Sequence, residues 1–309
     1  MRSLLIFHFL LLVIFPASAE PVLDYRLSPV QVAKDTYVFI GKKEDFSFEN
    51  GGNIVNTGFI VTTEGVVVID TGPSYQYGLQ MRQAINKVTN QPIIKVLLTH
   101  HHPDHILGNQ AFSDVPIYAL PGTINLIKRD ASAFLDNVFR MVGDWMRGTE
   151  LFDEIIPLLD ERELIGGHDL TYISMEGHTG GDLIILDETT AVLFAGDLVF
   201  HNRALTTPHA EPDKWKASLR RLNEMEYKII VPGHGEIAED KLPIMQTLEY
   251  LIWLEDKISE SVEMGLDMNE VLESQIPERF QSLSILQHEF ARSVIHRYPV
   301  YEEKLFNKQ

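Results

Sequence analysis

The chain has 309 residues, of which 44 are acidic and 26 are Lys or Arg, so its formal net charge is −18. This balance argues against a nucleic-acid-binding protein, because a phosphate backbone is bound by a basic surface. The sequence has no Cys, which excludes disulfides and a cysteine-linked lipid. No Pro/Gly/Ser-rich linker, repeat or low-complexity tract divides the chain, so residues 20–309 are predicted to form one domain.

The first 19 residues have the order of a secretory signal peptide. Arg2 precedes a mostly apolar run over 4–15, and Pro16-Ala17-Ser18-Ala19 follows it. This is the succession of charge, apolar core and A-x-A site that a signal peptidase cuts. A membrane anchor is the alternative, but the run is shorter than the roughly 20 residues that span a bilayer. We therefore expect cleavage before Glu20 and a periplasmic or secreted protein without a membrane span.

After this leader, apolar runs alternate with amphipathic stretches. Strands are predicted over 37–40, 57–61, 66–69 and 93–98 and, in a second set, over 170–175, 183–186, 191–195 and 228–231. Helices are predicted over 77–88, 121–148, 212–225 and 241–264, and the acidic, amphipathic end of the chain is interpreted as a helical cover over about residues 241–309. Two sets of strands with helices beside them predict an α/β sandwich of two sheets.

The most informative stretch is Thr99-His100-His101-His102-Pro103-Asp104-His105, directly after the last strand of the first set. The carboxyl end of a strand is where α/β sheets place their chemistry. Imidazoles and carboxylates suit zinc, so these residues are candidate metal ligands, with a solvated His run as the alternative. In an extended backbone His100 and His102 point to one side and His101 to the other. A helix is expected to begin near Ile106.

Three further candidate ligands lie downstream. Glycines surround each of them and allow tight turns, so each is expected in a loop after or between apolar runs. They are His178 in Glu176-Gly177-His178-Thr179-Gly180-Gly181, Asp197 in Phe194-Ala195-Gly196-Asp197, and His234 in Val231-Pro232-Gly233-His234-Gly235.

In this order, the motifs His-x-His-x-Asp-His, Gly-His-Thr, Gly-Asp and Pro-Gly-His-Gly resemble the metallo-β-lactamase superfamily, over about residues 34–240. The resemblance implies an α/β fold, the αββα four-layer sandwich of two mixed β-sheets, and two Zn²⁺ ions per chain. It implies that His100, His102 and His178 hold one metal, that Asp104, His105 and His234 hold the second, and that Asp197 bridges them. It also implies that Asp70, at the end of Val66-Val67-Val68-Ile69-Asp70, supports the ligands from behind.

Differences between this sequence and particular members of the superfamily indicate which branch it resembles most. True metallo-β-lactamases generally lack the bridging Asp, so Asp197 and the absence of Cys resemble the glyoxalase II-like hydrolases instead; β-lactam hydrolysis is kept as an alternative. His102 stands where flavodiiron relatives carry Glu, which favours hydrolysis. Persulfide dioxygenases keep nearly the same motifs with one iron and are a second alternative. The leader and the sequence around the motifs also resemble zinc metallohydrolases associated with periplasmic quinoprotein systems.

The implied reaction is hydrolysis of a small-molecule carbonyl substrate, an ester, thioester, lactone or amide, by a hydroxide shared between the two metals. Asp104 and Asp197 would be the catalytic residues, orienting the nucleophile and relaying a proton. No Gly-x-Ser-x-Gly elbow suggests a competing serine mechanism. A non-catalytic periplasmic metal- or cofactor-binding protein is the remaining alternative, although three His and a bridging Asp leave a position open for water. No pattern indicates an oligomeric state.

The surroundings of the site are open to two interpretations. Residues 42–52 either form a mobile flap whose Phe46 and Phe48 cover an apolar substrate, or pack those rings on the sandwich. His201 and Arg203, just past Asp197, could reach the rim of the site and bind an anionic group, but a solvated loop is expected. The histidines that match no motif are expected to be surface or core residues rather than ligands: His168, His209, His288 and His296.

Overall fold

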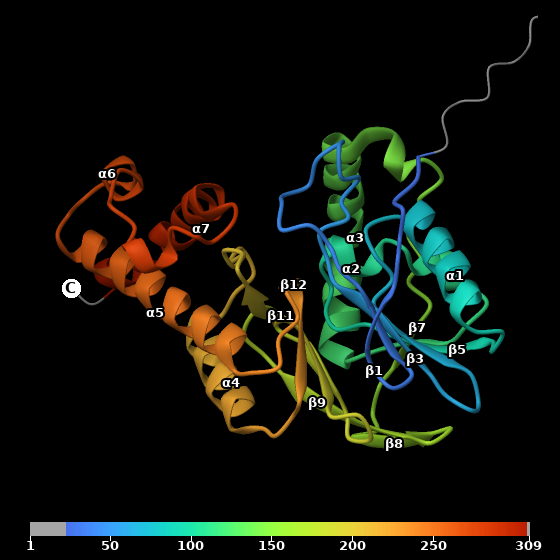
Figure 1. The fold of residues 1–309 in the computed structure, drawn as a ribbon. Helices are drawn as coiled ribbons and strands as arrows, with labels where there is room; N and C mark the ends of the chain where they lie inside the picture. The colour runs from blue at the N-terminus through green and yellow to red at the C-terminus, as the bar shows by residue number, and fades with distance from the viewer. Residues whose placement is uncertain (1–22, 308–309) are drawn as a thin grey trace, which may run out of the picture.

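The computed structural model describes residues 23–307, so the expected signal peptide lies outside the described residues. Two sheets face each other (Figure 1). The first has seven strands in chain order, β1 (Val30–Ala33), β2 (Thr36–Phe39), β3 (Thr57–Val61), β4 (Val66–Ile69), β5 (Ile93–Leu97), β6 (Ile117–Ala119) and β7 (Ile155–Pro157). The second has the order β12 (Ile229–Gly235), β11 (Val192–His201), β10 (Asp182–Asp187), β9 (His168–Met175), β8 (Arg162–Ile165).

Both sheets are mixed. Strands β1 to β4 pair antiparallel, whereas β4 to β7 pair parallel. In the second sheet β8 to β11 pair antiparallel, and β12 runs parallel to β11. Parallel neighbours need a crossover connection, which helices supply here.

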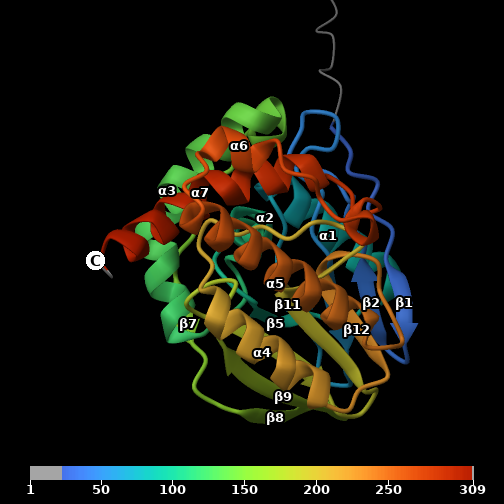
Figure 2. The ribbon, with the colours of Figure 1, turned by 90° about the vertical axis from the view of Figure 1, so that its left-hand side faces the viewer.

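Helices cover the outer face of each sheet (Figures 1 and 2). On the first sheet lie α1 (Tyr75–Val88), α2 (Pro103–Ile106), the 3-10 turn η1 (Asn109–Phe112), α3 (Pro121–Val142) and the 3-10 turn η2 (Gly143–Met146). Beside the second sheet lie α4 (Pro212–Glu224), α5 (Leu242–Glu263), α6 (Met268–Leu272), η3 (Glu278–Phe280) and α7 (Leu286–Phe306).

Alternation along the strands divides the core into three apolar layers. On β3 and β4, Phe59 and Val68 pack outward with α1, while Ile60 and Val67 pack inward against the second sheet. A third cluster joins the outer face of the second sheet to α4, α5 and α7. Successive side chains of a strand point to opposite faces of the sheet. Because both faces are apolar here, each face of the sheet must be covered by another layer. The structure therefore confirms the αββα four-layer sandwich.

The sequence placed β3 and β4 correctly, but three expectations were wrong. The helix after the His cluster begins at Pro103 rather than near Ile106, because proline is well suited to a first helical position. The helix expected over 121–148 ends at Val142, where Gly143 takes a positive φ of 60°. The second-sheet strands β11 and β12 run further than expected, through His201 and Gly235.

The expected helical cover over 241–309 corresponds to α5, α6 and α7, whose apolar residues join the same cluster as the second sheet. Within residues 23–307, no helix combines the length and apolar character needed to cross a bilayer.

Candidate metal centre

The His cluster leaves the carboxyl end of β5 in a backbone that Asp70 holds in place. Asp70 Oδ1 accepts from the Thr99 amide at 2.8 Å, and its Oδ2 accepts from Thr99 Oγ1 at 2.7 Å. The same Oδ2 lies 2.7 Å from His105 Nδ1. Asp70 is buried, so these bonds fix both the turn and the ring of His105. Asp70 thus lies behind the cluster, where the resemblance placed it.

The first candidate ligand group contains His100, His102, His178 and Asp197, whose ligand atoms all lie within 4.8 Å of one another. His102 Nδ1 lies 3.1 Å from His100 Nε2 and 2.9 Å from His178 Nε2. Burial lowers the pKa of His178 to about 3 and holds the pKa values of His100 and His102 well below their usual range. Burial thus favours the neutral form of these rings, which is the form that binds a metal, and their ligand atoms lie close together.

The second group contains Asp104, His105 and His234. His234 Nε2 lies 3.3 Å from Asp104 Oδ2, and His234 Nδ1 donates to the Ile54 carbonyl at 2.8 Å. Burial lowers the pKa of His105, but the carboxylates of Asp70, Asp197 and Asp104 outweigh it and raise that pKa well above its usual value. The second group thus has the negative potential that favours a cation.

Asp197 lies between the two groups. Its Oδ2 is 3.4 Å from His178 Nε2 and 3.1 Å from His234 Nε2, and its Oδ1 is 3.2 Å from His105 Nε2. Burial opposes ionisation, yet the histidines of both groups hold the pKa of Asp197 well below its usual value. A buried carboxylate between two sets of ligands has the placement of a bridge between two cations.

Unpaired polar atoms test whether these residues fit a metal. Asp197 Oδ1 and His105 Nε2 are buried and face each other at 3.2 Å, but neither makes a hydrogen bond of acceptable geometry among the described residues. Such an atom costs about 1–3 kcal/mol when nothing satisfies it. A cation between the two atoms would satisfy both, so the donor set fits metal ions of the zinc type.

The two strands that carry Asp197 and His234 approach each other very closely. Both residues lie within the assigned strands, so the expected loops were wrong; the β11–β12 register shifts on either side of Gly196. A Cβ on Gly233 would lie 1.9 Å from Asp197 Oδ1 and 2.7 Å from the Gly196 carbonyl carbon. Only glycine at this position leaves room for the Asp197 carboxylate.

Two supporting residues were missed in the sequence. Asp182 Oδ2 accepts from the amides of His178 and Thr179 at 3.1 and 3.0 Å, and burial raises the pKa of Asp182 to about 7. His102 Nε2 lies 2.8 Å from Nδ1 of His209. Asp182 stands four residues after His178, a spacing that could have indicated a turn; His209 lies on a loop and carries no such signal.

His101 belongs to neither ligand group around Asp197. Its buried ring lies 5.6 Å from the ring of Phe134 between centroids, and its Nε2 is 3.3 Å from Asp130 Oδ2. One of its ring nitrogens lies instead within 4.8 Å of ring nitrogens of His102 and His209. The ring nitrogens of His101 thus lie outside the two groups around Asp197, as the alternation argument expected, although they remain close to a ring nitrogen of His102.

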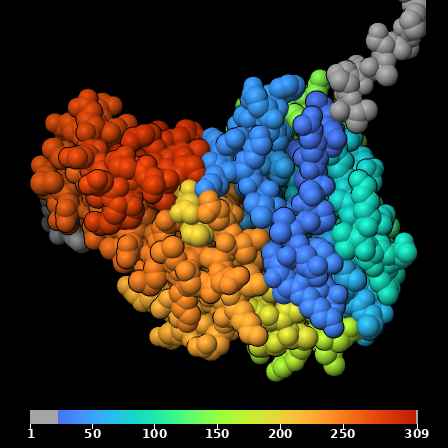
Figure 3. Space-filling model, viewed as in Figure 1, coloured from blue at the N-terminus to red at the C-terminus, as the bar shows by residue number. Residues whose placement is uncertain are grey.

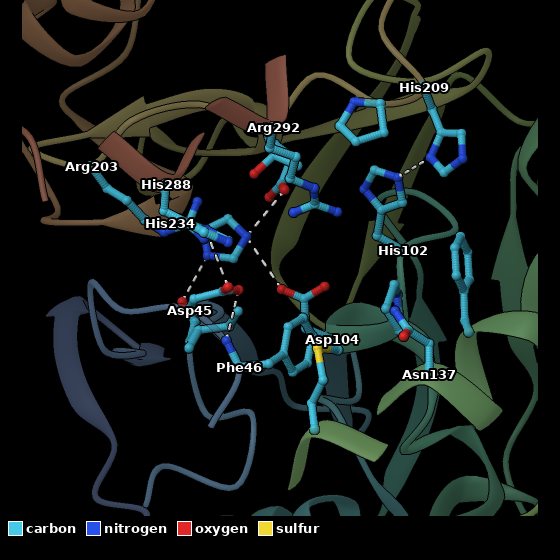
Figure 4. Close-up of a pocket in the computed structure, with 17 residues that line it drawn as sticks. Asp45, Phe46, His102, Asp104, Asn137, Arg203, His209, His234, His288 and Arg292 are labelled. Atoms are coloured by element: carbon cyan, nitrogen blue, oxygen red, sulfur yellow. Dashed lines mark hydrogen bonds and ion pairs between the residues drawn. The ribbon is translucent and has the colours of Figure 1, made fainter. Parts of the chain in front are cut away.

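A cavity of about 300 Å³ opens over the centre (Figure 4). Phe46 lines it, whereas Phe48 is 53% exposed and does not, so the segment 42–52 contributes one ring of the two. The solvated loop expected for His201 and Arg203 was wrong: both are buried, and Arg203 lines the cavity.

The histidines outside the motifs separate into two classes. His168 is a buried core residue paired with Asp187 at 2.8 Å. His209, His288 and His296 are exposed, as expected of surface residues, but His209 and His288 also line the cavity, which their lack of a motif did not predict. His288 Nδ1 lies 3.3 Å from Asp45 Oδ2 across the cavity rim.

Comparisons with known proteins agree with this geometry. The model of the metallo-beta-lactamase superfamily matches residues 50–234. A linear primary-alkylsulfatase of Pseudomonas sp. (strain ATCC 19151) is 21% identical over 77% of this chain, which spans 53% of the length of that enzyme. The acyl-coenzyme A thioesterase MBLAC2 of Homo sapiens is 27% identical over 60% of this chain and 75% of its own. Among solved structures, the metallo-beta-lactamase from Pontibacter korlensis has a TM-score of 0.60 at 22% identity, covering 73% of this chain and 99% of that one.

Proposed function

Because this chain belongs to the metallo-β-lactamase superfamily, whose curated relatives named above are hydrolases, we propose that it is a zinc-dependent hydrolase of the periplasm or the extracellular space. It would cleave an ester, thioester, lactone or amide. The observation that carries the proposal is the buried Asp197 carboxylate between two groups of ligand atoms, at the floor of a cavity. The location rests on the leader sequence alone.

We assign the first zinc to His100, His102 and His178 and the second to Asp104, His105 and His234, with Asp197 shared by both. When bound, two zinc ions would lower the pKa of water towards neutrality and polarise a substrate carbonyl. Asp104 and Asp197 both line the cavity, so their carboxylate oxygens can orient an attacking water and carry its proton to the leaving group.

The support for carbonyl chemistry comes from the bridge and from a relative. A carboxylate at position 197, with no Cys in the chain, is the pattern of the glyoxalase II-like branch, and the human relative is an acyl-coenzyme A thioesterase by name. We therefore place thioesters first among the substrates.

The experiment combines metal analysis with a panel of carbonyl substrates. Protein from its native compartment should begin at Glu20, contain close to two zinc ions per chain, and hydrolyse at least one simple thioester or ester. A chelator should abolish this turnover and added zinc should restore it. One iron with no zinc would instead indicate the persulfide-dioxygenase alternative, and turnover of a β-lactam alone would indicate a β-lactamase. Two tightly bound zinc ions without any turnover would indicate a binding protein.

We predict that His209 positions the ligand His102. Nδ1 of His102 faces His100 and His178. With a metal on this nitrogen, the ring proton of His102 would lie on Nε2 and donate to Nδ1 of His209. The variant His209→Ala should weaken zinc affinity at the first group by about 10–100-fold. His209→Asn, whose side-chain oxygen can occupy the same place, should retain most of the affinity. Competition with a chromophoric chelator measures both values.

His296 provides the matched control, since it is exposed on α7 and lines no part of the cavity. His296→Ala should leave zinc affinity unchanged. An unchanged affinity in His209→Ala as well would show that the 2.8 Å contact does not orient His102.

A further inference from the structure

The C-terminal helix α7 forms part of the cavity although it lies outside the part of the chain that matches the family. The match ends at residue 234, whereas α7 supplies His288 and Arg292 to the lining. Figure 3 shows the C-terminal helices beside the N-terminal half of the molecule, and the contact between His288 and Asp45 joins the two. The C-terminal helical cover is therefore part of the site, although the family model does not extend to it.

The lining that α7 and the end of β11 provide is cationic. Arg203 is 4% exposed, and its Nη1 and Nη2 donate to the carbonyls of Ala204 and Glu44 at 3.3 and 3.5 Å. Its Nε is buried without a hydrogen-bond partner among the described residues. Arg292 extends from α7 into the cavity on the side of Asp104 (Figure 4). Two guanidinium groups thus face one small space in a protein whose net charge is −18.

One buried carboxylate lies between these two arginines. Glu289 Oε1 is 3.9 Å from Arg203 Nη2 and 3.5 Å from Arg292 Nη1. Arg292 Nη1 thus donates a long hydrogen bond to Glu289, whereas Arg203 Nη2 lies beyond hydrogen-bond distance of the same oxygen. Glu289 is fully buried, so it offsets one positive charge and leaves the other available. Of the acids that line the cavity, Asp45 faces His288, and Asp104 and Asp197 belong to the metal centre.

The other part of the lining is apolar. Phe46, Ile54, Phe134 and Met141 line the cavity, from the segment 42–56 and from α3. In Figure 4, Phe46 lies across the cavity from Arg292. The space between the two walls leads to Asp104 and Asp197, at the metal centre.

We propose that Arg203 and Arg292 form a subsite for an anionic group of the substrate, a carboxylate, sulfate or phosphate, while an apolar chain on the other side of the scissile bond lies against Phe134 and Met141. This inference rests on the proposed hydrolytic function, because it concerns the same cavity. The substrate class is thus an anionic amphiphile small enough for about 300 Å³.

The test compares thioesters that differ only in one charge. Hexanoyl thioesters of 3-mercaptopropanoate and of 3-mercaptopropanamide form one pair; a second pair carries the carboxylate or the amide at the end of the acyl chain. Released thiol is read with a disulfide reagent, which finds no thiol in a chain without Cys. The purified holoenzyme should prefer the anionic member of at least one pair by about tenfold in kcat/KM. The pair that shows the preference identifies the side of the scissile bond that bears the anion.

In Arg292→Gln the ratio of kcat/KM between the anionic and the neutral member should fall to about one. Arg292→Lys should restore part of the preference. The charge-matched control is Arg220→Gln, because Arg220 is exposed on α4 and lines no part of the cavity; it should behave as the wild type. An anionic preference that survives in Arg292→Gln, or its absence in the wild type for both pairs, would overturn the subsite.

A second measurement separates this proposal from the proposed function. Octane-1-sulfonate, an anion with an apolar chain that cannot be hydrolysed here, is titrated by calorimetry into the same proteins. Its Kd should be about tenfold weaker for Arg292→Gln than for Arg220→Gln. If no thioester is cleaved but this difference holds, the hydrolytic function fails and the subsite stands. Equal Kd values would refute the subsite whatever the turnover.

Discussion

If the chain is the zinc-dependent hydrolase proposed above, replacing Asp197 by alanine should reduce turnover by more than about 100-fold and remove at least one of the two proposed zinc ions. The carboxylate lies within 3.4 Å of ligand atoms in both groups, so its loss removes the group that offsets the repulsion between two cations. Partners behind a ligand typically contribute 10–100-fold, and a ligand shared by both metals should contribute more. Zinc stoichiometry and turnover of the best substrate, measured on the same preparation of the variant, test both parts of this prediction.

His101→Ala is the matched control for this prediction, since His101 is equally buried and lies in the same motif. Its ring faces Asp130 and Phe134 rather than Asp197. We expect its zinc content to remain near two and its turnover to fall much less. Equal losses in the two variants would mean that the ligands within His100-His101-His102 are assigned one residue out of register.

The second large effect is expected from a single added methyl group. In Gly233→Ala the new Cβ would lie 1.9 Å from Asp197 Oδ1 and 2.8 Å from the Asp197 amide nitrogen, so the carboxylate or the strand must move. Overpacking of this kind typically destabilises a protein by about 1–3 kcal/mol. A shift of about 1 Å at a reacting group can reduce turnover roughly 100-fold. Calorimetric unfolding, zinc content and kcat measure the three consequences.

Gly180→Ala tests whether the effect belongs to position 233. Gly180 follows Thr179 in the loop of His178, its backbone is not in the left-handed region, and the nearest atom to an added Cβ is Leu126 Cδ1 at 3.8 Å. This variant should keep both its unfolding temperature and its zinc. A fully active Gly233→Ala protein would show that β11 and β12 can separate without disturbing Asp197.

The fold was predictable wherever a buried strand consists of a continuous run of apolar residues. The four valine and isoleucine residues of β4 define that strand to the residue, because a strand covered on both faces must be apolar throughout. Short strands such as β6 and β7 were not predicted, since three residues carry too little periodicity to be recognised. Their positions are set by pairing with β5 and with each other, a tertiary effect.

In the candidate site, too, residues in short local motifs were predictable, whereas residues brought in from distant parts of the chain were not. The ligand residues stand in short motifs with glycines, so their identities and grouping could be proposed before the structure. The roles of His209 and Arg292 could not be proposed from the sequence. His209 reaches His102 from a loop, and Arg292 reaches the cavity from α7, and both segments lie far along the chain from the ligand motifs of β5 and α2. Arg203 illustrates an ambiguous case: its position just past Asp197 suggested the rim, but only packing against Glu289 and Phe200 shows that it is buried.

The distribution of the ligands over the sandwich has a consequence for how the molecule holds together. The residues from His100 to His105 belong to the half built on the first sheet, whereas His178, Asp197 and His234 belong to the half built on the second. Cations held among them would therefore bind the docked halves and not the separated ones, adding a stabilisation of RT ln(1 + [M]/Kd) to their association. The metal centre would therefore cross-link the two halves of the sandwich. Its loss would weaken the packing between the two sheets.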